Sequence, residues 1–204
     1  GFNTAYDVSD APFRLGSVQG PAAGDPGLPR DVVRHWARDA IGELIAAGII
    51  LGYPDGTFRP DNSVTRAEFV AMLARTAGAD LSIPGSSNFS DVHPGDWYAP
   101  AIAVAVQNNW VTGYPDGSFR PNATISRQEA AVIISRLLNV EERVEEARRF
   151  SDGGAIAPWA AGHVGATSRA GIITGYPDGS FRPAGAITRA ETAVIISRSL
   201  SGLR

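Results

Sequence analysis

The sequence predicts a mainly α-helical protein in which three helix–loop–helix units pack around a pseudo-threefold axis. A nine-residue segment, GYPDGTFRP or GYPDGSFRP, begins at Gly52, Gly113 and Gly175, so its periods are 61 and 62 residues. A tryptophan stands 16 positions before each segment, at Trp36, Trp97 and Trp159. A four-residue word follows each segment and starts at Thr65, Ser126 and Thr188. Three landmarks at fixed offsets, three times over, identify tandem repeats.

The first helix of each unit is expected to begin at or near the tryptophan. Apolar residues such as Ile41 and Leu44 then recur at the spacing of one helix face. Twelve residues past each tryptophan stands a residue type that accepts the left-handed conformation closing a helix: Gly48, Asn109 and Gly171. The third copy, predicted over 159–170, contains Gly162 and Gly165, which lower its intrinsic helix propensity.

The nine-residue segment reads as a turn followed by an extended stretch. In Tyr53–Gly56 the proline presets φ, and the aspartate and the glycine suit the later turn positions. A phenylalanine in each copy is expected to anchor the loop in the core: Phe58, Phe119 and Phe181. A proline two residues later keeps the chain extended before the next helix.

The second helix of each unit is predicted to begin at the four-residue word. Its serine or threonine suits the N-cap, and a glutamate three residues later completes a capping box. The pairs are Thr65 with Glu68, Ser126 with Glu129, and Thr188 with Glu191. The residues that follow are strongly apolar, as in AVIISRLL at 131–138. No single unit can bury so apolar a helix, so the three should form a central bundle that folds as one cooperative unit.

The repeat predicts unit boundaries at 28–78, 79–139 and 140–204. Residues 1–27 match no repeat and are interpreted as a linker or N-terminal arm. A mixed-charge stretch at 141–149 is interpreted as a solvated helical turn in preference to a binding patch.

Composition argues against several classes of function. The chain has 204 residues and a formal net charge of −3, which gives no sign of nucleic-acid binding. No apolar stretch approaches the roughly 20 residues of a membrane helix. Cysteine is absent, which excludes disulfides and thiol chemistry. All 18 basic residues are arginines, as codon bias in a GC-rich genome would produce. Each therefore carries a planar guanidinium group, which is suited to binding a carboxylate or a phosphate. A signal peptide is expected to have been removed or to lie outside this sequence.

No catalytic centre, metal site or cofactor is expected. The three histidines fall at non-equivalent places in the repeats: His35, His93 and His163. No Ser–His–Asp, metal-spaced or paired-carboxylate arrangement stands out. Asp55 followed by Glu68 suggests part of a calcium loop, but Arg59 stands where a ligand oxygen is required and the glutamate spacing is wrong.

The tryptophan-headed helix, the GYPDGTFRP-type loop and the TRAE word, repeated about every sixty residues, resemble the S-layer homology family over residues 28–204. Two features depart from the family pattern. The Phe-x-Asp-Val opening motif is complete at 89–92, partial at 150–152 and absent at 28–32, and the second word is SRQE. The resemblance implies a three-pronged spindle with the TRAE helices at its centre. It also implies a monomeric, extracellular module that binds anionic, often pyruvylated, secondary cell-wall polysaccharides in grooves between repeats.

The arginines at the first position of the second helices are the leading ligand-binding candidates: Arg66, Arg127 and Arg189. The helix macrodipole disfavours a cation there by about 0.3–1 kcal/mol, so an anion is expected to hold each of them. The anion is either an internal carboxylate, for example that of Asp55, Asp116 or Asp178, or an acidic group of the polymer. A polymer anion would also meet free amides at the helix start. The resemblance favours the polymer, and on that hypothesis alanine at these positions abolishes binding and leaves thermal stability about the same.

Most of the remaining candidates also have a purely structural explanation. The tryptophans Trp36, Trp97 and Trp159 would stack on sugar rings or simply anchor helix packing. The glycines Gly52, Gly113 and Gly175 would admit a sugar to the backbone or satisfy a turn. The loop arginines Arg59, Arg120 and Arg182 would line groove walls. The glutamates Glu68, Glu129 and Glu191 are interpreted as helix caps in preference to ligand contacts.

The sequence therefore favours a non-enzymatic module that holds an exported protein on an anionic polysaccharide of a bacterial envelope, with up to three grooves adding avidity. The alternative is a protein–protein module that assembles the subunits of a surface lattice.

Overall fold

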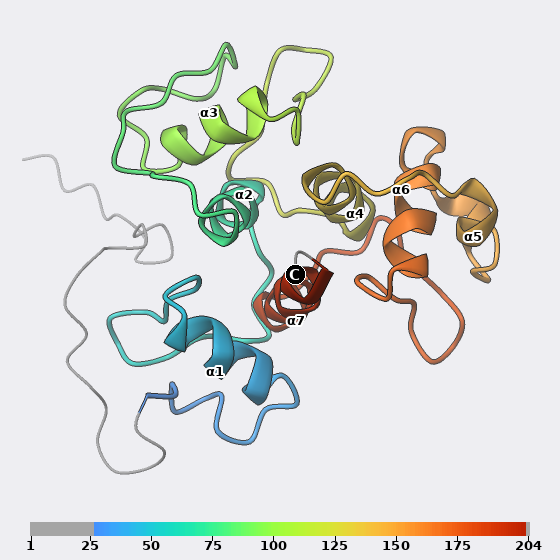
Figure 1. The fold of residues 1–204 in the computed structure, drawn as a ribbon, viewed down its shortest axis with the longest axis horizontal. Coiled ribbons are helices and arrows are strands. Elements are labelled where there is room, and N and C mark those ends of the chain that lie inside the picture. The colour runs from blue at the N-terminus through green and yellow to red at the C-terminus, as the bar shows by residue number, and fades with distance from the viewer. Residues whose placement is uncertain (1–26, 203–204) are drawn as a thin grey trace, which may run out of the picture.

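The computed structural model of the chain describes residues 27–202, which form a mainly α-helical molecule with a three-pronged outline (Figure 1). Its central helices are α2 (Arg66–Thr76), α4 (Arg127–Leu137) and α7 (Arg189–Gly202). Its prong helices are α1 (Arg38–Ala46), α3 (Ala99–Gln107) and α6 (Pro158–Arg169), and two short elements precede the last of them, α5 (Val144–Ala147) and the 3₁₀ helix η2 (Gly153–Ala155). The described residues form isolated β-bridges but no strand. The predicted fold class is confirmed, whereas the predicted arm at 1–27 lies, except for Gly27, outside the described residues.

The three prongs surround the central helices in cyclic order (Figure 1). Each prong helix packs on the central helix of the preceding unit: α3 on α2, α6 on α4, and α1 on α7. The chain therefore closes into a ring, because its first helix packs on its last one.

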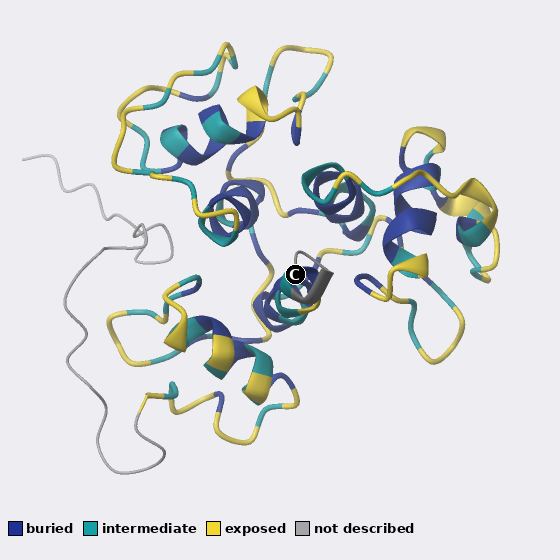
Figure 2. Cartoon of the chain, in the orientation of Figure 1, coloured by how far each residue is buried: buried dark blue, intermediate teal, exposed yellow. Residues whose placement is uncertain are grey.

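The central helices are buried on nearly all faces, as Figure 2 shows. In α2, every residue from Phe69 to Ala74 is buried, and α4 is buried continuously from Ala130 to Ser135. A helix that is apolar all round finds partners on several sides. Here the partners are the other central helices and one prong helix.

A ring of backbone hydrogen bonds joins the three units at the start of the central helices. The amide of Val64 donates to the carbonyl of Ile187 (3.0 Å), that of Ile187 to Ile125 (3.3 Å), and that of Ile125 to Val64 (3.0 Å). All three side chains are buried. Each unit therefore donates to one neighbour and accepts from the other, which closes the pseudo-threefold arrangement.

The local signals read from the sequence are confirmed. In all three central helices the N-cap hydroxyl accepts from the glutamate amide, and the glutamate accepts from the N-cap amide. The helix-ending residues Gly48, Asn109 and Gly171 adopt φ values of 69°, 59° and 70°. The central helices therefore begin where a side chain satisfies one of their first amides, and the prong helices end where one residue adopts the left-handed conformation.

The mixed-charge stretch forms the helical turn α5, but it is packed against α6 and is not fully solvated (Figure 1). Ala147 is buried, and the amide of Arg143 donates to the carbonyl of Gly162 (2.8 Å). A Cβ on Gly165 would stand 1.7 Å from the carbonyl oxygen of Arg143. The two glycines that weaken the helix in isolation therefore allow the backbone of this stretch to approach it closely.

Candidate functional site

Arg127 lies inside the molecule and joins the second unit to the third. Its Nε donates to the carbonyl of Phe181 (2.8 Å) and its Nη2 to the carbonyl of Thr174 (2.8 Å). Its Nη1 forms an ion pair with Glu191 (3.2 Å). The guanidinium therefore has hydrogen-bond partners on three of its edges.

The same arrangement recurs around the ring. Arg66 donates to the carbonyl of Phe119 (2.9 Å) and pairs with Glu129 (3.1 Å). Arg189 donates to the carbonyls of Phe58 (2.8 Å) and Leu51 (3.1 Å), with Glu68 at 3.9 Å. The exposed fractions of Arg66, Arg127 and Arg189 are only 5%, 5% and 1%. The internal carboxylate that offsets the macrodipole is thus the capping glutamate of the next unit, and not the loop aspartate considered from the sequence.

The amides at the starts of the central helices are also satisfied internally. In α4 the amides of Arg127 and Gln128 donate to the carbonyls of Gly185 and Pro183 (2.9 and 3.0 Å). The first two amides of α2 and α7 make equivalent bonds to the loop of the next unit. The expectation that a polymer anion meets free amides there is wrong, because the neighbouring loop occupies that position.

The capping glutamates carry a second function in addition to capping. Oε2 of Glu129 accepts from the N-cap residue Ser126, while Oε1 accepts from the hydroxyl of Tyr114 (2.5 Å) and from Arg66. Burial opposes ionisation of Glu129, but the hydrogen bonds from Tyr114 and Ser126 and the charge of Arg66 outweigh it and hold the pKa of this carboxyl below its usual value. Each glutamate therefore starts its own helix and binds the arginine of the preceding unit.

Each loop tyrosine is contacted by two arginines. The centroid of the Tyr176 ring lies 4.0 Å from the guanidinium of Arg182 and 4.5 Å from that of Arg127. Arg182 also pairs with Asp178 (2.8 Å). The same contacts form on Tyr53, from Arg59 and Arg189, and on Tyr114, from Arg120 and Arg66. Each tyrosine ring thus interacts with one loop arginine and with one arginine of a central helix.

Three aspartates that sequence reasoning missed hold the loops in place. Asp91 accepts from the amides of Phe119 and Arg120 (both 2.7 Å), and Arg120 has a φ of 57°. Asp31 and Asp152 do the same for the other two loops. These aspartates could have been found from their regular spacing and from the Phe-x-Asp opening motif at 89–91 and 150–152. A carboxylate accepting two amides stabilises a left-handed conformation that an arginine otherwise disfavours.

Replacing Asp91 by alanine is expected to lower the free energy of unfolding by about 1.5–3 kcal/mol, because the two loop amides lose a charged acceptor. Urea denaturation measures the change. Asp116→Ala is the matched control in the same loop, since this exposed carboxylate bonds only within its own turn and to Arg120. Equal losses in the two variants would contradict this function for Asp91.

The repeated tryptophans are not equivalent. Trp36 is 67% exposed and Trp159 is 57% exposed, so packing is not what these side chains provide. Trp97 is half-buried and packs edge-on against Tyr98, with ring centroids 5.4 Å apart. The packing explanation therefore fits Trp97 only.

Two of the repeated glycines are required because an aromatic ring lies where a side chain would begin. A Cβ on Gly113 would stand 2.2 Å from the ring of Phe89, and one on Gly175 would stand 2.5 Å from the ring of Phe150. A Cβ on Gly52 would stand 3.0 Å from the carbonyl oxygen of Thr57 and 3.5 Å from the side chain of Pro29. The first unit lacks the phenylalanine of the opening motif, so no aromatic ring approaches this glycine as closely.

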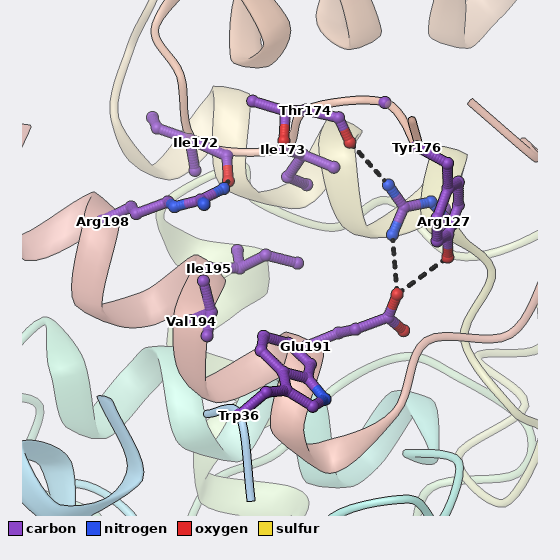
Figure 3. Close-up of a pocket in the computed structure, with 11 residues that line it drawn as sticks. Trp36, Arg127, Ile172, Ile173, Thr174, Tyr176, Glu191, Val194, Ile195 and Arg198 are labelled. Atoms are coloured by element: carbon purple, nitrogen blue, oxygen red, sulfur yellow. Dashed lines mark hydrogen bonds and ion pairs between the residues drawn. The ribbon is translucent and has the colours of Figure 1, made fainter. Parts of the chain in front are cut away.

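A groove of about 170 Å³ lies where the three units meet on one side of the ring (Figure 3). Its walls are Trp36 from the first unit, Arg127 from the second, and the segment 172–176 with one face of α7 from the third. Figure 3 shows Arg127 and Arg198 at opposite ends of this face, with Ile195 between them. The predicted candidates Trp36, Arg127 and Gly175 are thus brought together, whereas Arg182 is not part of the wall.

A family model described as the S-layer homology domain matches residues 30–70, 88–131 and 149–193, which is well over half of the chain. The chain belongs to the S-layer homology family. The matched segments contain the three nine-residue loops and the starts of all three central helices. The internal arginine–glutamate pairs are therefore part of the family's matched region.

Several curated relatives carry a similar S-layer homology region. The chain is 39% identical over 174 residues to an amylopullulanase of Thermoanaerobacterium thermosulfurigenes, covering 81% of this chain and 9% of that protein. It is 35% identical over 161 residues to a cellulosome-anchoring protein of Acetivibrio thermocellus, covering 76% and 36%. It is 31% identical over 174 residues to a surface-layer 125 kDa protein of Lysinibacillus sphaericus, covering 84% and 14%. The chain thus spans at most about a third of these relatives.

None of the helices in 27–202 has the length and apolar character needed to cross a membrane. No group of three or more histidine, aspartate or glutamate side chains in this part of the chain is arranged to hold a metal ion.

Proposed function

We propose that this chain is a non-covalent anchoring module that holds an S-layer protein or an exported enzyme on the bacterial cell surface. Its partner is an anionic secondary cell-wall polysaccharide, of the pyruvylated kind that the family resemblance implies. The observation that carries the proposal is the groove between units, where the exposed indole of Trp36 faces cationic side chains and open backbone. The relatives named as a cellulosome-anchoring protein and a surface-layer protein support it.

The proposed contacts follow from the chemistry of the groove wall. An indole that is two-thirds exposed offers a flat apolar face to a sugar ring. Gly175 presents backbone without a side chain, and Arg127 bounds the site. We extend the proposal to the equivalent residues of the other units: Trp97, Trp159, Gly52, Gly113, Arg66 and Arg189. Since these arginines are matched internally, their contribution is to shape the wall and hold the neighbouring loop. The loop arginines Arg59, Arg120 and Arg182 support the tyrosines behind it.

A sedimentation assay tests the proposed function. The purified chain is expected to pellet with native wall sacculi and to stay in solution after the attached polymer has been chemically stripped. Trp36→Ala is expected to weaken pelleting with little change in melting temperature, whereas Trp97→Ala is expected to lower the melting temperature in addition to any effect on pelleting, because the Trp97 side chain is half-buried. Undiminished binding to stripped walls would instead favour peptidoglycan or a protein partner, as in a lattice-assembly module. No substrate turnover by this chain alone is expected.

A further inference from the structure

The charges on the groove wall do not cancel. Arg127 and Glu191 form an ion pair at one end, and Arg198 stands at the other end (Figure 3). No carboxylate of residues 27–202 lies within 4.0 Å of Arg198. The groove therefore carries one positive charge that the described part of the chain leaves unneutralised, and that charge belongs to Arg198.

Arg198 is also the groove cation with hydrogen-bonding capacity to spare. Arg198 is exposed, and the one hydrogen bond that its side chain makes within residues 27–202 runs from Nη1 to the carbonyl of Ile172 at 3.4 Å, near the outer limit for such a bond. A guanidinium has five N–H donors, so several of them face solvent. Arg127, in contrast, is buried and directs its donors to Phe181, Thr174 and Glu191.

The face of α7 separates the acidic end of the groove from the basic end. Glu191 and Arg198 are seven residues apart, which places them on the same face about 10.5 Å apart along the helix axis. Val194 and Ile195 lie between them and form an apolar strip facing the side of the groove that Trp36 bounds. A sugar ring between the indole and this strip would direct an acidic substituent toward Arg198 and keep it away from the Glu191 carboxylate.

The equivalent arginines of the other units are less accessible. Arg75 in α2 and Arg136 in α4 occupy the same position as Arg198, and both are half-buried. The tryptophan that would face Arg75 is Trp97, which is itself half-buried. Of the three equivalent arginines, only Arg198 is therefore exposed.

We propose that Arg198 is the anion-binding residue of the groove bounded by Trp36, and that it recognises the carboxylate of an acidic sugar or of a carboxylate-bearing acetal on a sugar. This inference rests on the proposed polysaccharide binding. In this proposal the negatively charged group of the ligand binds near the last turns of α7, at Arg198, and does not bind to Arg127.

The test compares Arg198→Gln with Arg136→Gln, the same change at the equivalent position of another unit. The probe is the wall polymer released from sacculi, and titration calorimetry measures its dissociation constant. Arg198→Gln is expected to weaken binding by tenfold or more, on the order of one lost charge-assisted hydrogen bond, with Arg136→Gln within about twofold of the unchanged protein. Arg198→Lys should recover part of the loss, because it restores the charge without the planar fork.

The outcomes separate the two proposals. If the unchanged protein neither binds the released polymer nor pellets with sacculi, both proposals fail. If it binds, but Arg198→Gln binds equally well or Arg136→Gln weakens binding as much, only the assignment to Arg198 is overturned. Because Arg198 is exposed, its variants are expected to melt within a few degrees of the unchanged protein.

Discussion

Replacing Arg127 by alanine is expected to lower the free energy of unfolding by about 3–5 kcal/mol, measured by urea denaturation. The substitution leaves the Glu191 carboxylate, which is 19% exposed, without its cation. It also removes the donor from the carbonyls of Phe181 and Thr174. Unpaired buried acceptors and an unpaired buried charge are among the most destabilising changes a point mutation makes.

Arg182→Ala is the matched control, because Arg182 contacts the same tyrosine ring as Arg127, that of Tyr176. Its partner Asp178 is exposed, and an exposed pair four residues apart contributes little to stability. A much smaller loss than that of Arg127→Ala is therefore expected. If Arg127→Ala were as stable as the unchanged protein, the internal ion pair would not hold the units together, and the hypothesis drawn from the sequence would stand.

Because alanine at these arginines is expected to lower the free energy of unfolding, a loss of binding in such variants does not identify a contact residue. The sequence alone suggested that alanine at positions 66, 127 and 189 would abolish polymer binding and leave thermal stability about the same or slightly higher. With the guanidinium groups 5%, 5% and 1% exposed, loss of binding in such variants follows from loss of the groove wall itself. A contact residue is better identified on an exposed side chain such as Trp36 or Arg198.

The parts of the fold predicted correctly from the sequence are those determined by local chemistry. Capping boxes, left-handed helix ends and the Pro-Asp-Gly turn involve residues within about five positions of one another, and three copies exclude coincidence. The central bundle also followed, because helices as apolar as 131–138 have to be buried.

The partners of the site residues were beyond prediction because they lie in other units. Arg127 and Glu191 are 64 positions apart, and Asp91 binds amides 28 and 29 positions away. The arginine at the start of each central helix correctly predicted a nearby anion. The sequence did not indicate that the capping glutamate of the next unit supplies this anion. The exposure of Trp36 and Trp159 in contrast to Trp97 likewise depends on packing between units.

In the second and third units the connector packs closely on the prong helix, and a glycine permits this contact in both. The glycine lies on the connector in the second unit and on the helix in the third. In the second unit the connector carries Gly85, whose Cβ would stand 2.8 Å from the Cβ of Ala103 in α3. In the third unit the helix carries the glycine, and Gly165 occupies the position that corresponds to Ala103, six residues after the tryptophan. Close packing of connector on prong helix is thus common to both units, although the sequences that achieve it differ.

Replacing Gly165 by alanine is therefore expected to destabilise the protein by about 3 kcal/mol, toward the upper end of what overpacking costs. Glycine to alanine inside a helix ordinarily stabilises it by up to about 1 kcal/mol. Here the new Cβ meets the Arg143 carbonyl, a backbone atom that no side-chain rotation can move, so α5 has to leave α6. Thermal unfolding followed by circular dichroism measures the loss. Gly42→Ala provides the matched control, because Gly42 is the equivalent residue of α1 and its Cβ would meet only the Leu28 side chain, at 3.1 Å. That variant is expected to be as stable as the unchanged protein or slightly more stable, and a similar loss in both would show that the contact with Arg143 is not what requires glycine.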